Sequence, residues 1–251
     1  MIKTRILVAG CACALAGMLN APLLHADDLE QNLLAKWTFK NGSLKSEVGD
    51  FTLIEGGRKG TVEPGDGSVT LRDHKYLIVP EICSATYPDL AKGITIWARM
   101  KFDEFPVEHE ANVMSLQSVP KDGSWDSITM ALLYRGTDDG NSNPGLGFLA
   151  KLPNDVELGV GPSRFYPVAA GEFFNVALVF DGAAHTATMW VNGHPVTSER
   201  RDAETLKEFA AFAIGSLTAQ GHPCTVTFEE VRIYSTVLGP QWLDEIKPSK
   251  E

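Results

Sequence analysis

The sequence predicts an all-β protein in which two antiparallel sheets pack face to face, with one short helix near the C-terminus. The strongest evidence is residues 173–196, FFNVALVFDGAAHTATMWVNGHPV, which contain apolar residues in alternation. Alternation with a period of two is typical of a strand in a packed sheet. Many other short apolar runs, separated by turn residues and without a long helical pattern, favour two packed sheets over a mixed fold.

Residues 173–196 are interpreted as two antiparallel strands followed by a hairpin. Asp181-Gly182 ends the first strand, and β-branched and aromatic residues resume at Thr186. Asn192-Gly193 supplies the two left-handed positions of a type I′ turn, so we expect a return strand from His194. One face of the first strand is expected to carry Phe174, Val176, Leu178 and Phe180.

Further strands are expected on both sides of this stretch, and a helix only at the end. Pro240, followed by Trp242, Leu243 and Ile246 at helical spacing, predicts a short terminal helix. The other strand candidates are residues 69–80, 94–102, 113–116, 127–134, 146–151, 156–160 and 209–214.

Three motifs together resemble the laminin-G-like domains of the concanavalin A-like lectin and glucanase class. LLAKWTFKNGSLKSEVGDFTLIEGG (33–57) resembles the opening strand and acidic loop, and residues 173–196 resemble the paired strands before the Val-Asn-Gly turn. FEEVRIYSTVLGPQWLDEI (228–246) resembles the closing strand and its short helix. The resemblance implies an antiparallel jelly-roll sandwich over residues 33–248. It implies little about the ligand, because the family includes lectins, enzyme-attached modules and adhesion domains.

The N-terminus is interpreted as a secretory signal peptide, residues 1–26. Lys3 and Arg5 precede an apolar run, and Ala26 offers a small residue for cleavage. We therefore expect a secreted or periplasmic protein, with residues 27–32 as a loose lead-in. The alternative is a lipoprotein anchored at Cys11, since Val8-Ala9-Gly10-Cys11 is similar to a lipobox. No later run approaches the length of a membrane span.

The charge balance argues against nucleic acid as a partner. The chain carries a formal net charge of −10, and loss of Lys3 and Arg5 with the signal peptide leaves −12. A phosphate backbone needs a basic surface, and the sequence shows neither a Lys/Arg cluster nor a nucleic-acid-binding motif.

Cys83 and Cys224 are the two cysteines of the mature chain. In an oxidising compartment an isolated pair favours a disulfide, which would stabilise the fold by about 4–5 kcal/mol through chain entropy. Both cysteines lie beside expected strands, so a bridge between neighbouring strand ends is predicted. The alternative is two buried free thiols.

No catalytic constellation stands out, so a non-catalytic protein is expected. A retaining glucanase needs two close carboxylates, and the Glu-x-Asp-x-Glu motif that supplies them is absent. Glu108 and Glu110 are the weak candidate pair, whereas Glu229 and Glu230 are expected on opposite faces of a strand. There is no Gly-x-Ser-x-Gly elbow, and the histidines are scattered singly. A glycoside hydrolase or polysaccharide lyase of this fold stays an alternative.

Structural calcium is the cofactor considered, at two places. The family resemblance implies a site between Asp50, after the opening strand, and Glu229, on the closing strand. The chain has Glu where the family has Asp and a shortened loop at Gly49-Asp50. Alternation also reverses between Phe228 and Val231, which predicts a β-bulge at Glu229-Glu230. The second place is the loop 138–144, whose Asp and Asn residues are also ordinary turn formers.

Sugar binding needs an aromatic side chain that can stack on a pyranose ring, with polar groups around it. Trp37, Trp97 and Trp190 lie in strand patterns and are expected in the core, and Trp242 is expected to pack the helix. Trp125 lies in a loop and is left as the stacking candidate. Loops at sheet edges are expected to share one face, which gives the candidate ligand-binding set Trp125, Arg135, Asp138, Asp139, Asn141 and Tyr166.

The sequence thus predicts a secreted, non-catalytic, lectin-like module whose partners are extracellular polysaccharides or the glycans of glycoproteins. A structural or adhesion protein that binds other proteins is the main alternative, and it predicts an exposed apolar patch.

Overall fold

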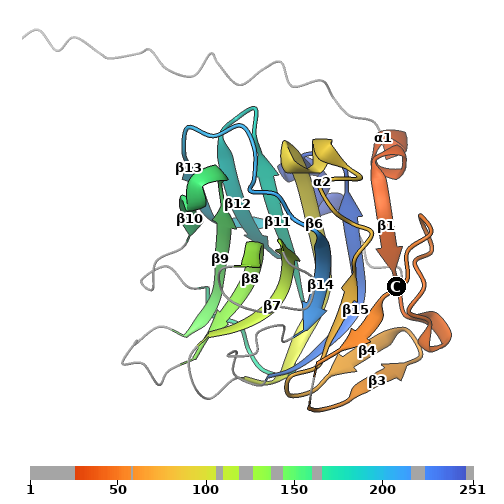
Figure 1. Ribbon diagram of the computed structural model, residues 1–251. Coiled ribbons are helices and arrows are strands. Elements are labelled where there is room, and N and C mark those ends of the chain that lie inside the picture. The colour runs from red at the N-terminus through yellow and green to blue at the C-terminus, as the bar shows by residue number, and fades with distance from the viewer. Residues whose placement is uncertain are drawn as a thin grey trace, which may run out of the picture.

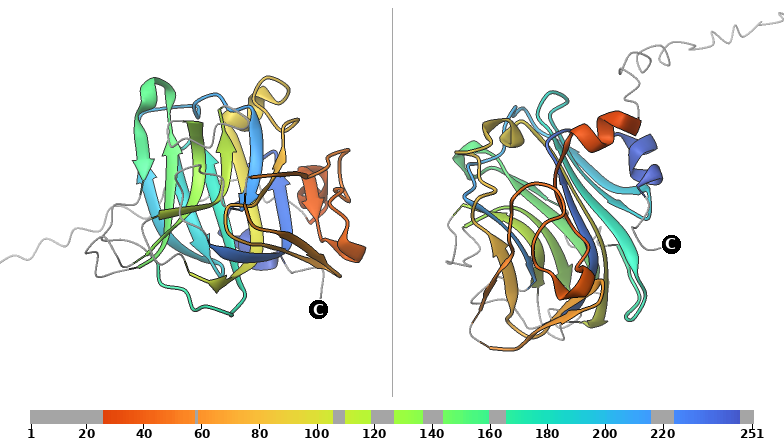
Figure 2. Two further views of the ribbon diagram at one scale, coloured as in Figure 1. Left: turned by 60° about the horizontal axis from the view of Figure 1, so that its bottom comes forward. Right: turned by 90° about the vertical axis from the view of Figure 1, so that its right-hand side faces the viewer.

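The predicted all-β sandwich is confirmed by the computed structural model, which describes residues 26–57, 59–105, 110–118, 127–136, 144–159, 166–215 and 224–246. Two antiparallel sheets face each other, and two short α-helices lie outside them (Figures 1 and 2). No helix in these ranges is long and apolar enough to cross a bilayer.

The larger sheet has eight strands in the order β13-β12-β11-β6-β15-β4-β3, with β1 also paired to β15. Its centre is β6, which pairs with β11 on one side and with β15 on the other. The strands are β1 (Leu33–Trp37), β3 (Val62–Gly65), β4 (Ser68–Leu71), β6 (Gly93–Glu104), β11 (Phe174–Asp181), β12 (Thr186–Val191), β13 (His194–Arg200) and β15 (Thr225–Tyr234).

The smaller sheet has seven strands in the order β10-β9-β8-β7-β14-β5-β2. They are β2 (Ile54–Gly56), β5 (Tyr76–Val79), β7 (Glu110–Gln117), β8 (Ile128–Arg135), β9 (Gly145–Lys151), β10 (Glu157–Gly159) and β14 (Ala211–Gly215). The helices are α1 (Ala26–Gln31) and α2 (Pro240–Glu245), with 3-10 turns η1 (Lys40–Gly42), η2 (Pro88–Ala91) and η4 (Pro153–Asp155).

The hairpin predicted from Asn192-Gly193 is confirmed. Both residues have positive φ, 49° and 77°, as a type I′ turn requires. Val191 pairs with His194, so the loop has two residues and fixes the register of β12 against β13.

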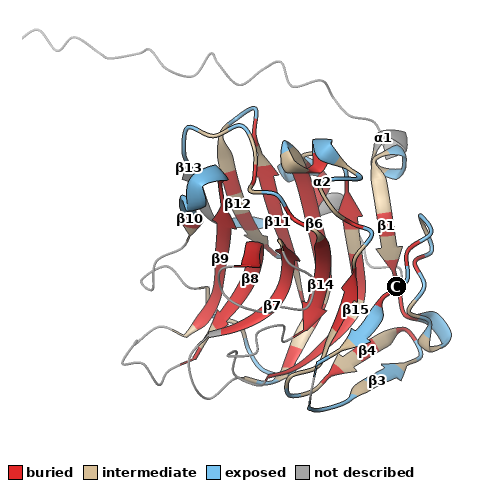
Figure 3. Ribbon diagram, viewed as in Figure 1, coloured by how far each residue is buried: buried red, intermediate tan, exposed pale blue. Residues whose placement is uncertain are grey.

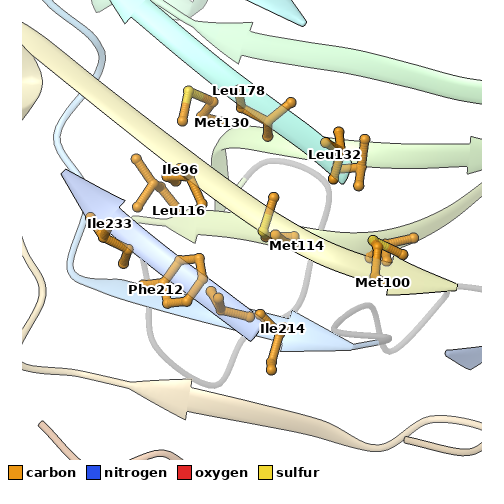
Figure 4. Close-up of a cluster of buried hydrophobic side chains, with 14 of the residues drawn as sticks. Ile96, Met100, Met114, Leu116, Met130, Leu132, Leu178, Phe212, Ile214 and Ile233 are labelled. Atoms are coloured by element: carbon orange, nitrogen blue, oxygen red, sulfur yellow. The ribbon is translucent and has the colours of Figure 1, made fainter. Parts of the chain in front are cut away.

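The core lies between the two sheets and is built from the inward face of each strand. Figure 4 shows Ile96, Leu178 and Ile233 of the larger sheet meeting Leu116, Leu132 and Phe212 of the smaller one. These side chains are fully buried. In the longer strands alternate residues contribute to this core, so the alternation seen in the sequence closes the sandwich, whereas the edge strand β2 contributes none of its residues.

A second apolar cluster covers part of the outer face of the larger sheet. Trp97 and Tyr234 pack there against Trp242 and Leu243 of α2, and Leu29 of α1 joins them. In the right-hand view of Figure 2, α1 and α2 lie side by side on this face. Residues 27–32 were expected as a loose lead-in, and the structure instead forms α1 over most of them, with Leu29 packed against this cluster.

The predicted bulge in β15 is confirmed, and it corrects one expectation. The register shifts between Phe228 and Glu230, so Glu229 is the extra residue. Glu229 accepts a hydrogen bond from Arg99 at 2.8 Å, and Glu230 accepts one from Arg232 at 2.6 Å. The bulge therefore brings both carboxylates to cations on the outer face, where regular alternation would have separated them.

Asp103, at the far end of β6, belongs to the same charged face. It pairs with Lys101 and accepts a hydrogen bond from Thr227 of β15. Burial opposes ionisation of Asp103, but the hydrogen bonds from Lys101 and Thr227 and the charge of Lys101 hold its pKa below the usual value. The ionised form thus favours the folded state.

The outer face of the smaller sheet is also buried, as Figure 3 shows for β8, β9 and β14. On β7 this face carries Asn112, Ser115 and Gln117. Gln117 donates to the hydroxyl of Ser115 at 2.8 Å and accepts a hydrogen bond from Ser127 at 3.2 Å. Asn112 is 1% exposed, and neither its amide nitrogen nor its amide oxygen has a hydrogen-bond partner among the residues that the structure describes.

Acid is expected to weaken the fold partly through Asp103. A carboxyl whose folded pKa lies below its unfolded value stabilises the protein above about pH 4, and this contribution is lost as the pH falls through the folded pKa. Asp103→Asn should therefore lose less stability between about pH 5 and pH 3 than the wild type does. Urea unfolding at both pH values measures this, with the exposed Asp202→Asn as control. Equal losses in wild type and Asp103→Asn would contradict the assignment.

Removing the buried amide of Asn112 should stabilise the protein. A buried polar group without a partner costs about 1–3 kcal/mol, so Asn112→Leu is expected to raise the free energy of unfolding. Ser115→Ala on the same strand is the matched control, and it should lower stability by about the same amount because Gln117 loses its acceptor. Chemical denaturation of both variants is the measurement. A loss of stability in Asn112→Leu would show that the amide is satisfied.

Candidate functional site

The two ends of the sandwich, named after the first and last residues of β6, carry different parts of the predicted ligand-binding set. At the Gly93 end, Ser118 and Ser127 flank the range that contains Trp125. At the Glu104 end, Arg135 pairs with Gly145 across the range that contains Asp138, Asp139 and Asn141. Trp125, Asp138, Asp139 and Asn141 themselves lie outside the described residues.

The expectation that these loops share one face is therefore wrong for the residues that flank them. Strands β7, β8 and β9 are antiparallel neighbours, so successive connections leave from opposite ends. Tyr166 lies at the Glu104 end with Arg135, where it forms a β-bridge to Leu146 and packs against the main core. The structure thus places Tyr166 and Arg135 together and separates them from the flanks of Trp125.

The predicted calcium ligands Asp50 and Glu229 each pair with a cation. The Asp50 carboxylate is 95% exposed and lies 3.1 Å from the Lys45 amine. Glu229 pairs with Arg99 at 2.8 Å. Among the described residues, no group of three or more His, Cys, Asp or Glu side chains could hold a metal ion. Calcium binding stays a prediction that nothing in this arrangement tests.

The weak catalytic pair cannot be assembled from the described residues. Glu108 lies outside them, and Glu110 is the first residue of β7. Glu229 and Glu230 are engaged with Arg99 and Arg232.

An open groove lies at the Gly93 end, and sequence reasoning did not identify it. Its volume is about 570 Å³, within the range of about 300–1,000 Å³ typical of small-molecule sites. It is lined by Cys83, Ser84, Ala85, Pro88, Ala91, Ser118 and residues 205–210.

The groove exists because residues 205–210, which precede β14, are tied across the end of the sandwich. Backbone N–H groups of Leu206, Lys207 and Ala210 donate to the carbonyls of Ala91 (2.7 Å), Lys151 (2.8 Å) and Gln117 (2.6 Å). Leu206 and Phe209 are buried in the main core and anchor the segment from beneath.

Ser84 joins the two walls of the groove. Its backbone N–H and its hydroxyl both donate to the Phe209 carbonyl, at 2.9 and 3.0 Å. The groove therefore presents hydroxyl groups, backbone and small apolar surfaces such as Ala85 and Pro88. Sequence signals for it are weak, since neither the segment 83–91 nor the segment 205–210 contains a motif.

Cys83 lines this groove as a free thiol, and Cys224 is a free thiol too, so the predicted disulfide is not formed. Ser84, beside Cys83, bonds to Phe209 at the Gly93 end, whereas Thr225, beside Cys224, pairs with Glu104. The twelve residues of β6 separate these ends. At about 3.3 Å per residue the separation is tens of ångströms, while a disulfide needs Cα atoms within about 7 Å.

The two thiols are expected to react very differently. Cys83 is partly exposed, whereas Cys224 is 4% exposed and burial raises its pKa to about 12. In residues 27–251, a maleimide should label Cys83 in the native protein and Cys224 only after unfolding in urea. Cys83→Ser should abolish the native labelling. Mass spectrometry counts the labels, and no label in urea without reductant would show that a disulfide exists.

Known structures share this fold at low sequence identity. The binding domain of botulinum neurotoxin DC in complex with SialylT aligns with a TM-score of 0.63 and 11% identity, over 86% of this chain and 51% of that chain. The same domain in complex with rat synaptotagmin II gives the same values. A structure of botulinum neurotoxin type C, described as dependent on two ganglioside molecules for cell entry, aligns with a TM-score of 0.62 and 11% identity, over 87% and 51%.

These similarities establish the jelly-roll fold, and the chain spans about half the length of the matched chains. No curated protein matches the sequence. A laminin-G family model, described as the concanavalin A-like lectin/glucanases superfamily, matches residues 76–244, about two thirds of the chain. The chain therefore belongs to the concanavalin A-like lectin/glucanases superfamily.

Proposed function

We propose that this protein is a secreted, non-catalytic carbohydrate-binding module, and that the groove at the Gly93 end receives the glycan. The observation that carries the proposal is the groove itself, an open site of about 570 Å³ built from two irregular segments on a rigid sandwich. Binding residues are often found on such segments, because the scaffold positions them without needing their side chains for the core.

The lining suits a sugar chemically. Ser84, Ser118 and Thr205 bring hydroxyl oxygens to the lining, and the hydroxyl protons of Ser84 and Ser118 are donated to the carbonyls of Phe209 and Ser127. The hydroxyl oxygens can accept hydrogen bonds from sugar hydroxyls, while Ala85 and Pro88 offer surfaces for the C–H faces of a pyranose ring.

Trp125 fits this proposal as the stacking side chain. Ser118 lines the groove and directly precedes the range that contains Trp125. Secretion through the signal peptide of residues 1–26 would bring the module to extracellular glycans.

Catalysis has little support at the groove. Glu208 is the one carboxylate among its described lining residues, and a glycosidase of either stereochemical type uses two. A binding role needs no such pair.

The experiment is a glycan array with residues 27–251, run with calcium and again with a chelator. Ala85→Met narrows the groove with a neutral side chain on an exposed position and should lower affinity about tenfold, or about 1.4 kcal/mol. Trp125→Ala should also weaken binding. The matched control is Ala170→Met, the same change at an exposed alanine beside Gly171, which bonds to Phe102 towards the Glu104 end.

A blank array under both conditions would overturn glycan binding and favour the protein-binding alternative. Binding that survives Ala85→Met unchanged would keep the function but place it outside the groove. Loss of binding with the chelator alone would add a metal ion to the site.

A further inference from the structure

The described lining of the groove contains two charged residues, Lys207 and Glu208, and Lys207 already forms an ion pair. Lys207 is the one basic residue among the described lining residues, and its amine forms an ion pair with Asp155 of η4. Lys92, beside η2, likewise pairs with Asp89 at 2.9 Å. Lys207 and Lys92 would each have to break an existing ion pair to bind an anionic ligand.

Glu208 differs from both lysines. It lines the groove, its side chain is exposed, and no ion pair or side-chain hydrogen bond joins it to any described residue. Its backbone carbonyl accepts a hydrogen bond from Thr129, which fixes the main chain at this position. The unpaired charge that the described groove presents to a ligand is therefore negative.

The net charge of the whole chain has the same sign as the charge of Glu208. The whole chain carries a net charge of −10. A sugar carboxylate or sulfate entering the groove would meet a like charge at Glu208, and the described lining residues include no unpaired cation to compensate it.

We propose that the groove selects neutral glycans and rejects uronate-containing and sulfated ones, with Glu208 as the residue that determines this specificity. The inference rests on the proposed glycan binding and names the ligand class of that same site. Glu208 acts in two ways: its carboxylate accepts hydrogen bonds from sugar hydroxyls, and its charge repels acidic sugars.

The sign of the potential in the groove can be measured without knowing the glycan, because Cys83 lies in its wall. Iodoacetamide and iodoacetate alkylate the same thiolate and differ in charge, so the ratio of their rates reports the local potential independently of the thiol pKa. Cys224 does not interfere, because it is buried and its pKa is raised to about 12.

The ratio is the rate with iodoacetamide divided by the rate with iodoacetate, and a negative potential raises it by slowing the anionic reagent. We expect the ratio at Cys83 to exceed the ratio for N-acetylcysteine amide by about threefold at low salt, and to approach that value as salt is added. Glu208→Gln should remove most of the excess. Glu204→Gln is the matched control, since Glu204 is exposed on the same stretch of chain but does not line the groove. A ratio equal to that of the small thiol, or one unchanged by Glu208→Gln, would overturn the inference.

The ligand class is tested on one array that carries neutral xylo- and laminari-oligosaccharides beside acidic alginate and heparin oligosaccharides. The wild type should bind only neutral probes. Glu208→Lys should gain affinity for acidic probes by about tenfold, and this gain should fall as salt is added.

The outcomes separate the two proposals. If the wild type binds acidic probes in preference to neutral ones, glycan binding stands and the inference fails. If the alkylation ratio is as expected but no probe binds, Glu208 sets the potential of the groove while both the proposed function and the ligand class are overturned.

Discussion

The feature on which the candidate site depends is the set of backbone hydrogen bonds that hold residues 205–210 across the Gly93 end of the sandwich. Leu206, Lys207 and Ala210 donate to carbonyls from three separate parts of the chain. These bonds pair backbone N–H and C=O groups that would otherwise lack a hydrogen-bond partner at the end of a sheet. The buried side chains of Leu206 and Phe209 hold residues 205–210 rigidly in place. Residues 205–210 cross the end of the sandwich and leave a space between themselves and the segment 83–91, and this space is the groove.

The sandwich beneath the groove is stabilised on the outer face of its larger sheet as well as in its core. On the larger sheet, the bulge at Glu229 brings Glu229 and Glu230 to Arg99 and Arg232, and α2 covers Trp97 next to them. Burial of Glu230 without a cation would be costly, so the bulge and the arginines belong together. The scaffold can therefore carry irregular segments at its ends without losing its register.

The sequence was informative wherever local chemistry decides structure. Alternation located the longer strands but not the short edge strands β2 and β3. Asn192-Gly193 predicted the hairpin, and the reversed alternation after Phe228 located the bulge. Contacts between distant segments could not be derived in the same way. Cys83 and Cys224 both lie at strand ends, as expected, but strand order in space sets which ends are neighbours, and it places these two at opposite ends. The groove was missed for the same reason, because Ser84 and Phe209 meet only once the sandwich is closed.

The central claim is that a neutral glycan occupies the groove at the Gly93 end, and footprinting of Cys83 tests it most directly. The measurement is the rate of Cys83 alkylation by iodoacetamide in residues 27–251, with and without a saturating amount of the neutral oligosaccharide that binds best on the array. A bound glycan should slow the reaction at least about tenfold, because Cys83 forms part of the groove wall. An unchanged rate with the glycan demonstrably bound would show that the glycan sits elsewhere and would contradict the account.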